Sequence, residues 1–289
     1  MRLDTYVAAR FVRSDGKELM ADGVDWLLTP GTVEGACKPV IDLFTQDNAT
    51  GDGATVTGKR VAARDMTMEV SAMRVRDNAV LRAKAVAFFN PAYTYKIYLT
   101  YQGRTRWLAS ELAGFNAPTD RVCIPQKFTV DFLAVSPYWQ SMDDFGQDIA
   151  AITPRWGFPY MDHPTHGVLV DVANFARRVV FDYDGDAPAY PTITITADDT
   201  VTNPKIIKDG VFVRLIDTMV KGDVVVITTN PRSIRITKNG KNVLNKVDRA
   251  SNFAGMQMLP GTNIVSYETD YGDNNMHVVI QYNKQYLGV

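Results

Sequence analysis

The stretch Pro125–Trp139, PQKFTVDFLAVSPYW, decides the fold of the first half of the chain. From Phe128 to Val135, large or apolar side chains alternate with smaller or polar ones, and this two-residue period predicts a β-strand with one face in a core. The other face also carries apolar side chains, at Leu133 and Val135, so we expect the strand to lie inside a sheet that is covered on both sides. Pro137 removes a backbone donor and restricts the residue before it, which predicts that the strand stops there.

The composition changes after Trp139, and this change predicts a boundary between two domains. Residues 141–167 contain three prolines and three glycines without a clean hydrophobic period. We therefore expect residues 1–140 to form one β-sandwich domain, residues 141–165 a linker, and residues 166–289 a second β-sandwich domain. A chain of 289 residues, 46% hydrophobic and 22% charged, is long enough to form two cores of ordinary size.

One helix and a series of hairpins are predicted in the first domain. Asn78–Phe89 has apolar side chains at helical spacing, a capping residue at its start and Pro91 shortly after its end. Gln102-Gly103 separates two alternating runs and predicts a hairpin turn. The glycine-rich stretch Asp47–Gly58 lies between strand-like residues, which predicts a loop or the tip of a protruding hairpin.

The second domain is predicted to be entirely β. Short runs of β-branched residues recur along it, separated by turn dipeptides such as Asp209-Gly210, Gly222-Asp223 and Asn239-Gly240. Many short strands with turns between them are typical of a β-sandwich.

Charge and cysteine content exclude several classes of protein. The formal net charge is −1, made up of +2 in residues 1–140 and −3 in residues 141–289, so neither half has the basic excess of a nucleic-acid-binding protein. No apolar run follows the first residues as in a secretory signal, and no run is long enough to span a membrane. Cys37 and Cys123 lack metal-ligand spacing, and we expect them to be free, mostly buried thiols in a reducing compartment.

Two short clusters invite a metal-site interpretation, and we interpret both as structural. His163 and His166 flank a proline that prevents helical presentation, so they are expected to be exposed linker residues. Asp182, Asp184 and Asp186 resemble the start of a calcium loop that lacks the required glycine and glutamate, so a strand-end turn is expected. No nucleotide-binding or nucleophile motif is present, and we predict no catalytic, cofactor-binding or metal-binding residue and no cofactor. A glycosidase with a carboxylate pair from distant strands stays open as a weaker alternative.

Two surface features have both a structural and a functional interpretation. Tyr138, Trp139, Trp156 and Tyr160 cluster near the boundary, where they are expected to join the two domains, or alternatively to stack on sugar rings. Residues 59–84 are locally basic, which indicates a solvated face or a rim that contacts an acidic neighbour in an assembly.

The order of several short segments resembles a known family. These segments are Phe88–Pro91, Asp131-Phe132, Pro137–Trp139, Tyr183–Asp186, Ala189–Ile193, Asn203-Pro204, Asn239-Gly240 and Leu259–Asn263. In this order and spacing, the chain resembles the distal tail proteins of siphovirus-type bacteriophages over nearly its whole length.

The resemblance implies a structural virion protein rather than an enzyme. It implies that the first domain, a β-sandwich with one packed α-helix, assembles into a hexameric ring, and that a galectin-like second domain lies outside the ring. The implied partners are the tail tube protein, the tail-tip hub, and receptor-binding or fibre proteins, with the virion assembled in the host cytoplasm. The alternative is a galectin-like carbohydrate-binding module that recognises glycans of the host cell surface, and an enzyme of cell-wall breakdown is a third possibility.

Overall fold

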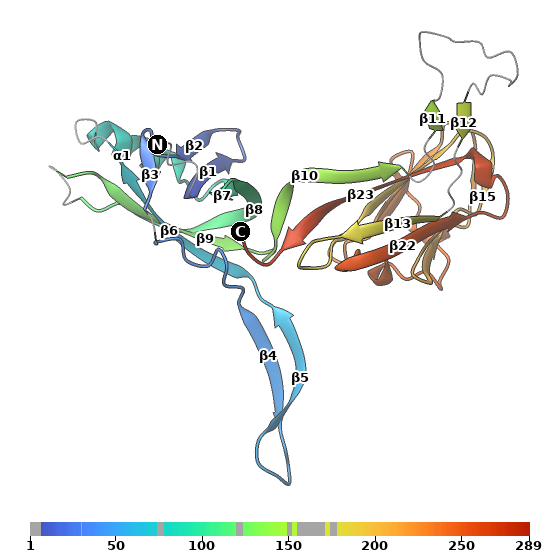
Figure 1. Ribbon diagram of the computed structural model, residues 1–289, viewed down its shortest axis with the longest axis horizontal. Coiled ribbons are helices and arrows are strands. Elements are labelled where there is room, and N and C mark those ends of the chain that lie inside the picture. Colours follow the sequence, from blue (N-terminus) through green and yellow to red (C-terminus); the bar gives the residue numbers. More distant parts are fainter. Residues whose placement is uncertain are drawn as a thin grey trace, which may run out of the picture. The chain divides into compact units, whose positions relative to one another are not determined.

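The protein is described here from a computed structural model, which is mainly β with one α-helix among the described residues (Figure 1). The described residues are 7–29, 31–73, 78–119, 124–148, 152–154, 171–173 and 178–289. The chain divides into two compact units, one made of Met1–Met142 with Gln285–Val289 and the other of Asp143–Lys284. The expected mainly β fold with one helix is confirmed. The last five residues, which we expected in the second domain, belong to the first unit.

The first unit is built from antiparallel strands around one core. Its strands are β1 (Val7–Arg13), β2 (Glu18–Ala21), β3 (Trp26–Leu28), β4 (Ile41–Asp47), β5 (Ala54–Val61), β6 (Arg64–Ala72), β7 (Thr94–Tyr101), β8 (Arg104–Asn116) and β9 (Lys127–Ala134). The long strand β8 pairs with β7 along its first half and with β9 along its second half, so it joins the row β2-β1-β7 to the row β9-β6-β3. Strands β10 (Trp139–Asp148) and β23 (Met276–Tyr286) cross the division between the two units.

The second unit is built mainly from two sheets whose inner faces share one core. Its other strands are β11 (Ile152–Pro154), β12 (Asp171–Ala173), β13 (Arg178–Tyr183), β14 (Thr192–Ala197), β15 (Val201–Thr202), β16 (Lys205–Lys208), β17 (Val211–Arg214), β18 (Thr218–Met219), β19 (Val224–Thr228), β20 (Arg235–Lys238), β21 (Lys241–Asn242) and β22 (Gly261–Glu268). Strands β23-β14-β19-β20-β21 follow one another in one sheet, and β13-β22-β16-β17 form the other. Buried side chains from both sheets belong to a single hydrophobic cluster, which is the arrangement expected of a sandwich.

Strand β9 lies in the interior of its sheet, as its alternation predicts. It pairs with β6 on one side and with β8 on the other, and Phe128, Val130 and Phe132 are buried on its core face. The expectation that its second face is also covered is wrong for this chain, because Leu133 is 36% exposed and Val135 is 59% exposed. The single chain supplies one covering layer, so two apolar side chains stay at the surface.

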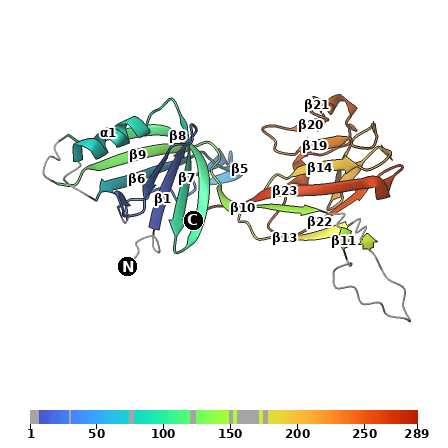
Figure 2. The same cartoon turned by 90° about the horizontal axis from the view of Figure 1, so that it is seen from above.

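The helix α1 (Asn78–Phe88) lies along the strands of the first unit and covers its core (Figure 2). Leu81, Ala85 and Phe88 face the core at spacings of four and three residues, as the sequence predicts. The side chain of Asn78 accepts a hydrogen bond from the Gln126 backbone and donates one to the carbonyl of Ile124, so it ties the helix start to the segment before β9.

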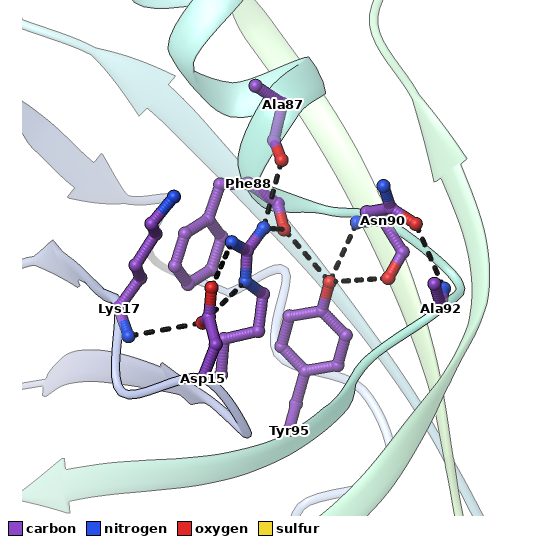
Figure 3. Close-up of polar contacts among 8 residues, drawn as sticks. Asp15, Lys17, Ala87, Phe88, Asn90, Ala92 and Tyr95 are labelled. Carbon is purple, nitrogen blue, oxygen red and sulfur yellow. Dashed lines mark hydrogen bonds and ion pairs between the residues drawn. The ribbon is translucent and has the colours of Figure 1, made fainter.

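The other end of α1 is held by Arg13, a buried arginine at the end of β1. Figure 3 shows Asp15, Ala87, Phe88 and Tyr95 gathered at this end of the helix. The Arg13 guanidinium donates to the last helical carbonyls, of Ala87 at 3.0 Å and Phe88 at 3.1 Å. It also donates to both carboxylate oxygens of Asp15, at 2.8 and 2.5 Å. A cation near a helix C-terminus interacts favourably with the helix dipole and with carbonyls that have no partner within the helix. The hydroxyl of Tyr95 accepts from the Asn90 backbone at 2.7 Å and completes this end of the helix.

The first prediction concerns the core face of β9. Phe132 is 1% exposed and its ring stacks on Phe11 with centroids 5.7 Å apart. The Phe132→Ala substitution should lower the free energy of unfolding by ~3–5 kcal/mol, because it removes buried area and leaves a cavity. The matched control is Leu133→Ala on the outward face, which should cost less than ~1 kcal/mol. Denaturant unfolding of both variants is the measurement, and equal losses would contradict the assigned faces.

The second prediction concerns the loss of stability at low pH. The Arg13 guanidinium lowers the pKa of Asp15 from 3.8 to about 2. A carboxyl whose pKa is lower in the folded state stabilises the fold fully above its unfolded pKa, and this stabilisation is lost as the pH falls through 2. Between pH 4 and pH 2, the melting temperature of the wild type should therefore fall more than that of Asp15→Asn. Asp25→Asn, which removes an exposed carboxyl from the same unit, should follow the wild type, and identical pH profiles for all three proteins would refute the role of Asp15.

Candidate assembly arm and its buried root

The most exposed element of the first unit is the hairpin of β4 and β5, which we call the arm (Ile41–Val61). Its strands pair with each other in a separate two-stranded sheet and with no other described strand (Figure 1). No residue of the arm belongs to the buried core. Of the two expectations for residues 47–58, a loop or the tip of a protruding hairpin, the structure shows the hairpin, and its strands leave only residues 48–53 as the turn.

The turn of the arm is held by hydrogen bonds within the arm itself. The Asn48 backbone donates to the carbonyl of Gly53 at 3.1 Å, and the Thr55 hydroxyl donates to the Asn48 side chain at 3.0 Å. Gly53 has a φ of +89°, a conformation that glycine adopts without steric cost. The arm therefore has a definite conformation despite its polar, glycine-rich tip.

The two faces of the arm differ in chemistry. Because side chains alternate across a strand, the pairs Ile41↔Val61, Leu43↔Lys59 and Thr45↔Val56 lie on one face. Ile41, Leu43 and Val56 on this face are 57%, 60% and 57% exposed. The opposite face carries Phe44 and the Asp42–Arg60 ion pair, at 2.9 Å, with the Arg60 guanidinium 5.6 Å from the Phe44 ring centroid. One face therefore carries an ion pair beside a half-exposed phenylalanine, whereas the other exposes an apolar stripe beside one lysine.

The root of the arm is closed by Arg64, the first residue of β6. Its guanidinium is fully buried and donates to four backbone carbonyls. These belong to Gly35 at 2.5 Å, Ala36 at 2.9 Å, Pro137 at 2.7 Å and Leu287 at 2.6 Å. Arg64 therefore connects the chain before the arm, the start of β6 after it, the segment between β9 and β10, and the returning residues 285–289.

Carbonyl oxygens take the place of a carboxylate in balancing this buried charge. In the part of the chain that the structure describes, no carboxylate forms an ion pair with Arg64. Burial lowers the pKa of its guanidinium, yet arginine stays protonated in proteins because its ordinary pKa is above 12. Hydrogen bonds from a charged donor are stronger than neutral ones, which offsets part of the cost of removing the charge from water.

Gly35 and Trp139 complete the same cluster. Gly35 has a φ of +79°, and a Cβ there would lie 2.0 Å from the backbone oxygen of Asp65, so only glycine fits. Trp139 is fully buried, and its indole nitrogen donates to the carbonyl of Ala36 at 2.8 Å. The expectation that Trp139 joins the two domains is wrong, because its ring lies in the core of the first unit. Trp156 and Tyr160, its expected neighbours, lie outside the described residues.

The returning residues 285–289 are held by a second arginine. Arg106 of β8 donates to the carbonyl of Gly288, and its guanidinium lies 3.5 Å from the centroid of the Tyr286 ring. Cys37 lies 3.6 Å from the carbonyl of Val289 and is exposed, so the expectation of a buried thiol is wrong at this position. Cys123 lies outside the described residues.

The clusters that the sequence suggests as possible metal sites do not form one among the described residues. Within the ranges that the structure describes, no three potential metal-ligand side chains come together. Asp184 forms an ion pair with Lys284 at 2.7 Å, and His163 and His166 lie outside those ranges. The prediction that no residue is catalytic or binds a cofactor stays a prediction. No helix in the described part of the chain is long and apolar enough to span a membrane.

Composition alone does not predict that Arg64 is buried. From composition, Arg64 is one more basic side chain of residues 59–84, a stretch interpreted as a solvated face or a rim that contacts an acidic neighbour. The signal that identifies it is its position, because Arg64 is in phase with Met66, Met68 and Val70, which face the core.

Comparisons with known proteins show which family and which solved structures this chain is similar to. Residues 184–286 match the family model described as the C-terminal domain of the siphovirus-type tail component. The fold is similar to the crystal structure of the SPP1 Dit (gp 19.1) protein, with a TM-score of 0.66 and 14% identity over 96% of this chain and 98% of that chain. Two structures of the phage P2 baseplate in its activated conformation, with Ca and with Sr, match at a TM-score of 0.48 and 8% identity over 98% of this chain and 99% of those chains. No curated protein matches. The resemblance that the sequence suggested is thus confirmed in two respects: residues 184–286 match the family model, and the chain has the fold of the SPP1 Dit protein.

The third prediction tests the root of the arm. Arg64→Ala removes four hydrogen bonds from a charged donor and leaves buried carbonyls unpaired, so the first unit should lose at least ~3 kcal/mol of stability. Arg64→Lys should lose part of this, because one ammonium cannot reproduce the fork of a guanidinium. Arg60→Ala is the matched control, since Arg60 is exposed in the arm and its ion pair should contribute about 1 kcal/mol or less. Denaturant unfolding measures all three variants, and an Arg64→Ala protein as stable as Arg60→Ala would contradict the assignment.

Proposed function

From the resemblance to siphovirus-type distal tail proteins, we propose that this chain is a structural protein of a phage virion, not an enzyme, and acts as an adaptor at the distal end of the tail. Residues 1–140 form a hexameric ring, and the second, galectin-like domain lies outside it. The ring joins the tail tube protein to the tail-tip hub and to receptor-binding or fibre proteins. The subunits assemble in the host cytoplasm and bind no nucleic acid. The match of residues 184–286 and the fold of the whole chain support this proposal.

The observation that carries the ring is the exposed arm. A two-stranded hairpin alone is marginally stable in water, and three or more strands or a packed surface are needed for independent stability. Three apolar side chains of the arm are more than half exposed, which is unfavourable unless another surface covers them. A neighbouring subunit supplies that surface.

Ring symmetry explains why such an element is required. In a closed ring each subunit contacts the next through two different patches, and a permanent interface of this kind buries on the order of 2,000 Å². An interface of standard size uses roughly 20–30 residues on each side. The 41–61 hairpin approaches that size and reaches beyond the core of its own subunit.

The fourth prediction tests the arm by shortening it at paired positions. In the first variant, Asn-Gly replaces residues 43–59, which joins the opposed residues Asp42 and Arg60 and removes Leu43 and Val56. In the control, Asn-Gly replaces residues 48–53, which joins the opposed residues Asp47 and Ala54 and keeps the apolar face. Both variants should fold, because the arm contributes nothing to the core. The first should lose the ring, whereas the control should keep it.

Light-scattering mass at equal protein concentration measures the outcome. If the first variant forms the same ring as the wild type, the arm is an ordinary surface hairpin. If the wild type is a monomer that binds sugar at every concentration tested, the alternative of a carbohydrate-binding module replaces the adaptor.

A further inference from the structure

The outward face of the sheet β6-β9-β8 carries a leucine between two carboxylates. The register places Leu133 of β9 opposite Asp65 of β6 on one side and opposite Glu111 of β8 on the other. These three side chains, the acid–leucine row, share the outward face and are all exposed. Val135, just beyond the end of β9, is 59% exposed and adds apolar surface next to the row.

The positions next to the row add another carboxylate and no bulky side chain. Asp131, two residues before Leu133, accepts a hydrogen bond from the Thr67 hydroxyl at 2.7 Å. On the other side, Asp131 pairs with Gly114 of β8. A Cβ at Gly114 would lie 2.7 Å from the Asp131 carboxylate, so this position has no side chain on the face. Asp65, Glu111 and Asp131 therefore give the face a negative charge around its apolar centre.

The apolar face of the arm has the complementary pattern. Leu43 lies directly opposite Lys59, with Ile41 and Val56 on the same face. Lys59 is exposed and forms no ion pair with the described residues of its own chain. The arm thus presents a leucine beside a cation, and the sheet presents a leucine between two anions.

We propose that the acid–leucine row receives the arm of a neighbouring copy of this chain, with Leu43 against Leu133 and the Lys59 ammonium beside one of the two flanking carboxylates, Asp65 or Glu111. This inference rests on the proposed ring and names the surface that accepts the arm. A ring requires two different patches on one chain that fit each other, and these two patches match in both apolar area and charge. The neighbour's arm also provides the second covering layer that the alternation of β9 predicts and that the single chain lacks.

The fifth prediction is a charge-reversal rescue in the full-length protein. Lys59→Glu should raise the concentration at which half of the protein is assembled by about tenfold or more, because like charges then face each other. The pair Asp65→Lys with Glu111→Lys should weaken assembly in the same way. Combining all three substitutions restores opposite charges and should bring assembly back toward the wild type. Lys84→Glu, an equal change at an exposed position of α1, is the control and should leave assembly unchanged.

The measurement is light-scattering mass over a dilution series, with a thermal melt of each variant to verify folding. If the lysine pair fails to fold, Asp65→Asn with Glu111→Gln serves instead, and it should reduce the weakening of the ring by salt. The proposal is overturned if Lys59→Glu assembles like the wild type, if the combined variant assembles no better than its parents, or if the neutral pair leaves the salt dependence unchanged. If the adaptor proposal itself is wrong, the wild type will form no ring, and this outcome is distinct from the variant results above.

Discussion

The first unit depends on one buried guanidinium. Arg64 donates to carbonyls that are separated along the chain by up to 252 residues, from Gly35 to Leu287. Burying a charge without a counter-ion is costly unless its donors are hydrogen-bonded, so the four acceptors must be in place together. This requirement couples the root of the arm, the segment after β9 and the returning residues 285–289 into one cooperative cluster.

Local chemistry was sufficient to predict most of the elements from the sequence. The two-residue period of β9 and the helical spacing of α1 were correct to within about one residue. Asp209-Gly210 and Asn239-Gly240 have positive φ at both positions, as the favoured two-residue hairpin turn requires, and both were read from the dipeptides alone. These features depend on residues that are close in the sequence.

The features that were missed depend on residues that are far apart. The sequence places Arg64 in a basic stretch that indicates a solvated face or a rim in an assembly. It gives no sign of the backbone carbonyls that accept from the buried guanidinium. The sequence predicts Trp139 at the junction between the domains, whereas its ring lies in the core of the first unit and its indole donates to the carbonyl of Ala36. The prediction that Leu133 is covered is wrong for a different reason. A hydrophobic pattern indicates that a face is buried, but it does not indicate whether the same chain or another chain buries it.

The return of residues 285–289 has a consequence for the order of events during synthesis. The first unit is complete only when these residues reach Arg64 and Arg106, after the 142 residues of Asp143–Lys284 have been translated. At bacterial or eukaryotic elongation rates, this delay lasts on the order of ten seconds. During that interval Arg64 can bond to the carbonyls of Gly35, Ala36 and Pro137 but lacks the carbonyl of Leu287. The root of the arm thus gains its complete set of hydrogen bonds only after the second unit has been synthesised.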